Sequence, residues 1–143
     1  MATRAPEARE MTTTETSPRE IGVSFHHALA TRDWPMLRAL MSPNVTWTLP
    51  GDNAISGTAA GIDDVIARAE LIAAYGVSST LERVLVSRKN LAIGLRATAR
   101  RGEHVLDEYI AAVCTLRQGR IVQVEAYLDD VDGMNAFFAR DGG

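Results

Sequence analysis

Four runs of strand-forming residues between positions 78 and 128 constrain the fold of this chain more than any other feature. The runs are SSTLERVLVS, LAIGLRATAR, HVLDEYIAAVCTL and RIVQVEAYL, and only the short polar segments RKN, RRGE and RQGR separate them. Spacers of this length leave no room for a crossover helix, so successive strands must be antiparallel neighbours. The second half of the chain is therefore predicted to form a four-stranded meander.

The first half of the chain has helical patterns instead. The SPRE motif at 17–20 has the residues of a capping box with proline in the first turn, and it predicts a helix to about residue 31. Asp33 can cap a short second helix, which Ser42-Pro43 is expected to stop. Apolar residues at helical spacing predict a third helix over about 61–75.

This order of elements predicts an α+β domain over residues 17–141. Three N-terminal helices are expected to pack on one face of a curved, mostly antiparallel sheet, and a short C-terminal helix is expected after the last strand. Residues 1–16 are polar and aperiodic and are predicted to be a disordered leader, with Met11 as an alternative start.

Composition argues against several classes of function. The net charge is -3 and no basic stripe is present, so nucleic-acid binding is not expected. No apolar run approaches the ~20 residues that span a bilayer and the N-terminus lacks a signal-peptide core, so we expect a cytoplasmic protein without a membrane partner. Cys114 is the only cysteine and no metal-ligand spacing occurs, so no metal site and no cofactor are expected.

The segment VTWTLPGDNAISG at 45–57 joins a strand pattern to a polar turn. Val45, Trp47 and Leu49 alternate with threonines, as in a half-buried strand that stops at Pro-Gly. A surface loop has little use for a tryptophan, whereas a strand on a cavity wall can use it as a flat apolar surface. The alternative is that Trp47 is ordinary core.

Further segments follow in a set order. They are Gly61 at the start of the third helix, ATARRGEHVLDE at 97–108, LRQGRI at 116–121 and AYLDD at 126–130. Together with WTLPGDNAISG at 47–57, they make the chain resemble the nuclear transport factor 2-like superfamily, and within it most closely the SnoaL-like polyketide cyclases and ketosteroid isomerases. The resemblance implies a cone-shaped α+β barrel whose curved sheet and first helix enclose an apolar pocket.

The same resemblance implies which residues contact a ligand. Trp47 and Leu49 on the first strand would line the pocket, together with Phe25 from the first helix and Val124 and Leu128 from the last strand. The acids of the steroid isomerases are missing, because the general base corresponds here to Thr48 or Leu49 and the protonated aspartic acid to Ala111 or Ala112.

Asp107, Glu108 and His26 are the remaining candidates for acid/base chemistry. Asp107 and Glu108 are adjacent on a strand, so only one can point inward, and the apolar alternation favours Glu108. A two-residue turn within RRGE would instead put Arg96 beside Asp107, so Asp107 stays an alternative, and surface or dimer-interface charge is the alternative for both acids. Arg96 would bind a carbonyl or enolate oxygen, and His26, on the flank of the first helix's apolar stripe, would assist.

These residues lead to two hypotheses from different classes. The first is a small cofactor-independent cyclase, isomerase or dehydratase that moves a proton on a hydrophobic polycyclic or polyketide-derived carbonyl compound. The second is a non-catalytic hydrophobic ligand-binding or accessory protein of a biosynthetic pathway; a cofactor-free oxygenase or epoxide hydrolase is a weaker alternative. A homodimer through the convex sheet face is also expected, because Tyr109, Val113 and Tyr127 are too apolar to leave in water.

Overall fold

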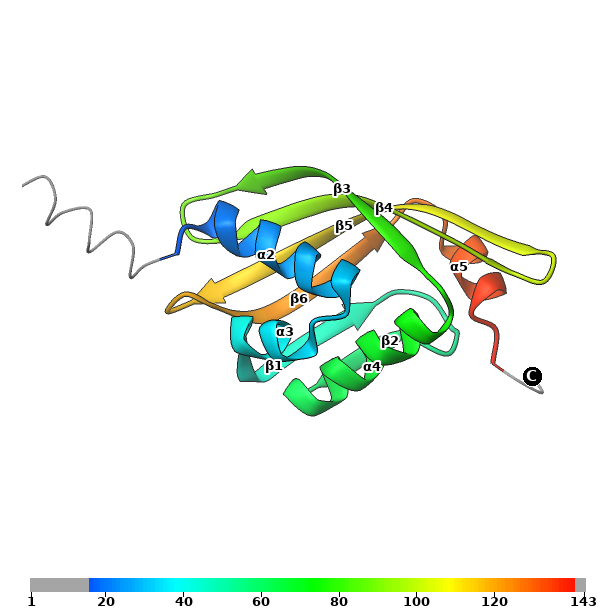
Figure 1. Cartoon of the computed structure of the whole chain (residues 1–143), viewed down its shortest axis with the longest axis horizontal. Helices are drawn as coiled ribbons and strands as arrows, with labels where there is room; N and C mark the ends of the chain where they lie inside the picture. Colours follow the sequence, from blue (N-terminus) through cyan, green and yellow to red (C-terminus); the bar gives the residue numbers. More distant parts are fainter. Residues whose placement is uncertain (1–15, 141–143) are drawn as a thin grey trace, which may run out of the picture.

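The computed structural model describes residues 16–140, and the predicted leader lies almost wholly outside the described residues. A six-stranded sheet with the order β2-β1-β6-β5-β4-β3 curves around the helices (Figure 1). The elements are α2 (Pro18–Thr31), α3 (Trp34–Leu40), β1 (Met41–Leu49), β2 (Gly57–Ala60), α4 (Ile62–Ala74), β3 (Ser78–Val86), β4 (Leu91–Arg101), β5 (His104–Arg117), β6 (Arg120–Leu128) and α5 (Val131–Phe137). The predicted α+β architecture is confirmed.

The meander is present as the spacers predicted, with β3, β4, β5 and β6 paired antiparallel in chain order. The turn between β4 and β5 differs from the expected register by two residues. Arg101 pairs with His104, so Gly102 takes the first turn position with a φ of 62°, which glycine adopts at no steric cost. Arg96 therefore lies opposite Tyr109 and not opposite Asp107.

Local capping explains why the first helix begins where the sequence predicted. The Ser17 hydroxyl accepts a hydrogen bond from the Glu20 backbone N–H, and the Glu20 carboxylate accepts one from the Ser17 N–H. This reciprocal pair satisfies two donors that would otherwise lack partners at the helix start. The buried face of α2, which includes Ile21 and Phe25, points at the sheet.

One prediction near β1 was wrong, and one strand was missed. The second helix ends at Leu40, and Ser42-Pro43 lies inside a strand that starts at Met41. The proline is tolerated because the pairing of β1 with β6 is irregular between Met41 and Thr46, where no ladder hydrogen bond needs its nitrogen. The strand β2 was not predicted, since its four small residues carry no alternating pattern; it pairs with β1 and places Ala59 opposite Trp47.

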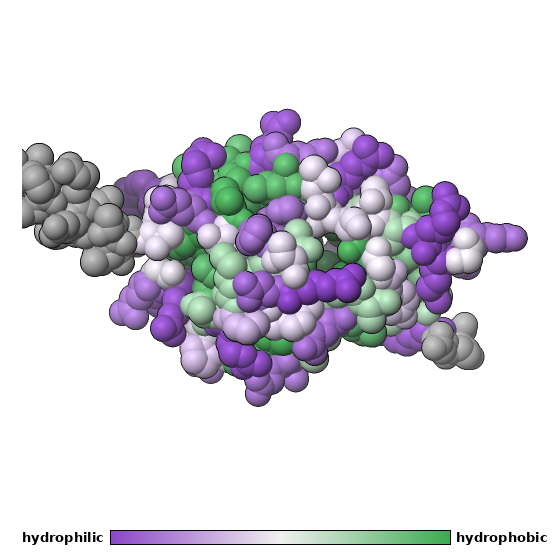
Figure 2. Space-filling view, in the orientation of Figure 1, coloured by the Kyte–Doolittle hydropathy of each residue, from purple (hydrophilic) through white to green (hydrophobic). Residues whose placement is uncertain are grey.

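The helices α2, α3 and α4 lie on one face of the sheet, and α5 lies near the end of the β4–β5 hairpin (Figure 1). Apolar side chains also reach the surface, among them Val23 on α2 and Leu85 and Val86 on β3, and Figure 2 shows green area over this part of the fold. Among the described residues, none of the helices combines the length and apolar character needed to cross a bilayer.

Candidate functional site

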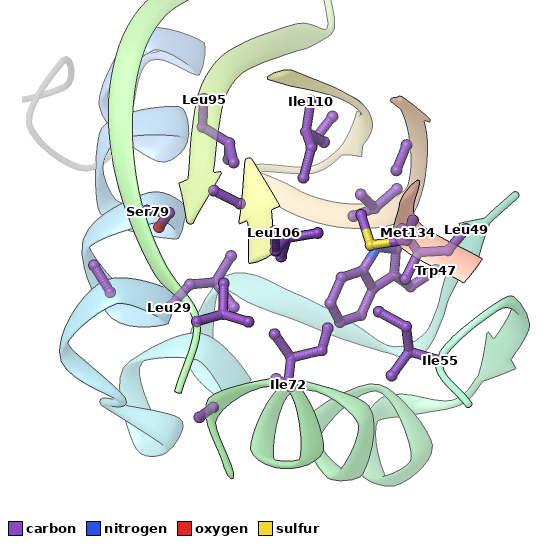
Figure 3. Close-up of a pocket in the computed structure, with 18 of the residues that line it drawn as sticks. Leu29, Trp47, Leu49, Ile55, Ile72, Ser79, Leu95, Leu106, Ile110 and Met134 are labelled. Atoms are coloured by element: carbon purple, nitrogen blue, oxygen red, sulfur yellow. The ribbon is translucent and has the colours of Figure 1, made fainter. Parts of the chain in front are cut away.

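A cavity of about 120 Å³ lies between the helices and the inner face of the sheet (Figure 3). Every strand except β2 contributes residues to its wall. The helices α2, α4 and α5 and the β1–β2 turn also contribute residues. Of the 21 lining residues, 19 are apolar, and the other two are Arg32 and Ser79. A concave apolar wall with few polar groups is typical of small-molecule sites.

Four of the five predicted apolar contacts line this cavity: Phe25, Trp47, Leu49 and Val124. Leu128 does not line it. It is half-buried at the last position of β6, where the chain leaves the sheet toward α5. The last residue of β6 that lines the cavity is Ala126.

Trp47 is held in place by a residue that sequence reasoning missed. The guanidinium carbon of Arg68, on α4, lies 5.3 Å from the centre of the Trp47 ring. Its nitrogens donate to the backbone carbonyl of Trp47 at 2.8 Å and to those of Ser56 and Gly57 at 3.3 and 3.0 Å. One side chain thus connects α4, β1 and the start of β2. No local pattern marks this role, because the partners lie 11 to 21 residues away in sequence.

Glu108 is buried, as the alternation on β5 predicted, with only 1% of its surface exposed. Its Oε1 has no hydrogen-bond partner among the described residues. Burial, helped by the neighbouring carboxyl of Asp129, raises the pKa of Glu108 to about 7. The raised pKa allows Glu108 to hold its proton at a higher pH than an exposed glutamate does.

The Glu108 side chain does not itself line the cavity. Leu106 and Ile110, its inward neighbours on β5, both do. Gly133 of α5 lies against Glu108: a Cβ added to that glycine would be 3.3 Å from Glu108 Oε2. The next residue, Met134, lines the cavity, so the start of α5 covers the carboxyl group on this side.

Arg96 and Asp107 lie on the outer face of the sheet. Arg96 Nε donates to Asp107 Oδ1 at 2.8 Å and Nη2 to Oδ2 at 2.7 Å, and each side chain is nearly half exposed. The two residues are diagonal neighbours on adjacent strands, which brings long side chains within reach. These hydrogen bonds lower the pKa of Asp107. Neither side chain reaches the cavity, so Arg96 does not occupy the carbonyl-binding position assigned to it and Asp107 does not face a ligand.

His26 is part-buried on α2, and its Nε2 lies 3.0 Å from the Ser79 hydroxyl. The pKa of His26 is lowered, because desolvation by burial lowers it more than the hydrogen bond at Ser79 raises it. His26 is outside the cavity wall, whereas Ser79 is part of it. Sequence reasoning named His26 and missed Ser79. Within residues 16–140, no three His, Cys, Asp or Glu side chains gather in a way that would hold a metal ion.

Comparison with known proteins now places the chain in a family. The model of the SnoaL-like domain matches residues 23–124. The chain belongs to the SnoaL-like domain family. An uncharacterized protein of Mycobacterium tuberculosis is 31% identical over 116 residues, which is 78% of this chain and 88% of that protein.

Solved structures agree with this SnoaL-like assignment at the level of the fold. Bal32a, from a soil-derived mobile gene cassette, has a TM-score of 0.80 at 24% identity and covers 83% of this chain and 94% of its own. A putative SnoaL-like polyketide cyclase from Jannaschia sp. CCS1 has a TM-score of 0.68 at 19% identity, covering 88% and 98%. An NTF2-like protein from Burkholderia xenovorans LB400 has a TM-score of 0.70 at 19% identity, covering 82% and 92%. The chain therefore has the nuclear transport factor 2-like fold that its motifs implied.

This SnoaL-like domain has no ionisable group at the positions that correspond to the steroid-isomerase acids. Leu49 and Ala112 both line the cavity. The alternative positions, Thr48 and Ala111, do not line it; the Thr48 hydroxyl instead bonds Thr58 at 2.9 Å. A carboxyl group for acid/base chemistry at this cavity must therefore come from another position, and Glu108, next to the wall, is the buried candidate.

Proposed function

We propose that this SnoaL-like protein binds a compact hydrophobic small molecule in the cavity beside Trp47. The observation that carries the proposal is the wall itself, which is apolar at 19 of 21 residues and includes an indole face. An apolar cavity of about 150 Å³ in another protein takes up benzene, so about 120 Å³ suits a ligand with one ring. A polycyclic ligand needs side chains to move, and the flexible Met134 is suited to that.

Tryptophan fluorescence tests this binding directly. The chain has two tryptophans, and Trp34 is not part of the cavity wall, so a Trp34→Phe variant reports on Trp47 alone. Titration of that variant with toluene should change its emission and saturate. Adding Ala69→Phe to this variant would fill the cavity from α4 without a new tryptophan, and the double variant should lose the saturable response. A response that does not saturate in the Trp34→Phe protein would contradict the proposal.

A second proposed function is acid/base catalysis by Glu108. It is supported by a buried carboxyl group with an oxygen that has no partner among the described residues and a pKa of about 7. Such a carboxylate is suited to remove a proton next to a carbonyl group and, once protonated, to return it at the same or another carbon. Cyclases, isomerases and dehydratases acting on polyketide-derived carbonyl compounds use this step. Catalysis requires the ligand to reach past the start of α5.

Hydrogen exchange in a simple ketone tests the catalytic proposal without knowledge of the substrate. Proton NMR of cyclohexanone in D2O measures loss of the hydrogens next to the carbonyl. Glu108→Gln should lower the protein-dependent rate by about 100-fold or more. Asp107→Asn is the matched control, because this neighbour faces outward, and it should leave the rate unchanged. If Glu108→Gln exchanges as fast as Asp107→Asn and the unmodified protein, Glu108 is excluded as the base and ligand binding is left as the function.

A further inference from the structure

Ser79 is the one uncharged polar residue of the cavity wall. It lies on β3, and Figure 3 shows it at the edge of the cavity beside α2. The other polar lining residue, Arg32, is exposed, and its Nη2 donates to the carbonyl of Ala73 at 3.2 Å near the end of α4. Ser79 is therefore the polar group best placed to meet an uncharged ligand inside the apolar wall.

His26 is the hydrogen-bond partner of the Ser79 hydroxyl. The imidazole is part of α2, lies 53 residues away in sequence and is 3.0 Å from Ser79 Oγ. A serine hydroxyl has one donor and two acceptor positions, so a single bond to His26 leaves capacity for a second partner. If His26 donates to Ser79, the hydroxyl hydrogen is free for a carbonyl oxygen. If Ser79 donates to His26, its oxygen is free to accept from a ligand hydroxyl.

Ser79 also lies in one row with the candidate acid. Ser79 pairs with Ala97 across β3 and β4, and Ala97 pairs with Glu108 across β4 and β5. Neighbouring strands are about 4.8 Å apart, so the Cα atoms of Ser79 and Glu108 are about 10 Å apart. Ala97 lines the cavity with a single methyl group. A ring over Ala97 would have the Ser79 hydroxyl on one side, while the Glu108 carboxyl lies outside the cavity wall beside α5.

We propose that Ser79, oriented by His26, is a hydrogen-bonding site for a carbonyl or hydroxyl oxygen of the ligand in this cavity. The ligand class is then a compact apolar ring compound with an oxygen on the side that faces α2 and β3. This inference rests on the proposed ligand-binding function, because it requires an occupied cavity. It does not require Glu108 to be catalytic.

Phenol and toluene test the site, because they are similar in size and differ by the hydroxyl group. Calorimetric titration of Ser79→Ala should show phenol binding weakened by about fivefold, the usual effect of one neutral hydrogen bond, with toluene affinity unchanged. Ser78→Ala is the matched control: it removes the same group from the same strand, where the side chain is exposed. This control should bind both compounds as the unmodified protein does.

The positioning role of His26 has its own readout in a double-mutant cycle. His26→Leu should weaken phenol binding in the protein that retains Ser79 and should have no further effect on phenol when combined with Ser79→Ala. A purely structural role for His26 would weaken phenol and toluene alike in both backgrounds.

The outcomes separate the two proposals. In one outcome toluene binds, and Ser79→Ala changes the affinities for phenol and toluene equally or changes neither. The hydrogen-bonding site is then wrong, while ligand binding by the cavity remains. If the unmodified protein binds neither compound, the ligand-binding function fails and the Ser79 site fails with it.

Discussion

The buried carboxyl of Glu108 should make the stability of this protein depend on pH in a way that one substitution removes. Its pKa is raised from 4.5 to about 7 in the folded protein, so folding favours the protonated form. The stability that this group contributes is fully present below its unfolded pKa of 4.5 and is lost as pH rises through about 7. Each pKa unit corresponds to about 1.4 kcal/mol, so the whole change is about 3 kcal/mol.

Urea unfolding followed by circular dichroism measures this change at about pH 4 and about pH 8. Other groups also titrate in this range, so the quantity to compare is the free energy of unfolding of Glu108→Gln minus that of the unmodified protein. This difference should rise by about 3 kcal/mol from the lower to the higher pH, because glutamine does not ionise.

Asp107→Asn serves as the control with the opposite sign. The Asp107 pKa is lowered by Arg96, so its carboxylate contributes stability that is present above its unfolded pKa of 3.8 and lost as pH falls. The free energy of unfolding of Asp107→Asn minus that of the unmodified protein should therefore not rise from the lower to the higher pH. A Glu108→Gln difference that stays constant between the two pH values would refute the reasoning, because it would mean that the carboxyl is not desolvated.

Three further predictions follow from other contacts. Ala97→Leu should fill the space between Ser79 and Glu108 and abolish binding of phenol and toluene in calorimetry, while the protein stays folded by circular dichroism. Arg68→Leu should lower the free energy of unfolding by about 2 kcal/mol, because three backbone carbonyls lose a charged donor, whereas Arg88→Leu in the exposed β3–β4 turn should be neutral. Finally, we expect a homodimer through the outer face of β5 and β6, where Tyr109 and Tyr127 are 50% and 56% exposed; light scattering should give twice the chain mass, and a single-chain mass at micromolar concentration would contradict it.

Much of the fold could be predicted because it depends on local physics. The capping box of α2 involves residues three positions apart, and its start at Pro18 was predicted from that spacing. The alternation on β5 favoured Glu108 inside and Tyr109 outside, because successive side chains of a strand point to opposite faces, and the structure has this arrangement. The small strand β2 escaped prediction, since pairing with β1 creates it and its own residues carry no pattern.

The candidate site depended both on local sequence patterns and on tertiary contacts. The sequence by itself determined the meander and the apolar faces that carry Phe25 and Trp47, because turn length and strand alternation act over a few residues. It favoured Glu108 as the inward acid but left Asp107 as an alternative. Only the tertiary structure decided that Ser79 meets His26, that Arg68 holds Trp47 and that α5 covers Glu108. Those contacts join segments that are far apart in the sequence, and a periodic pattern in one segment carries no information about its distant partner.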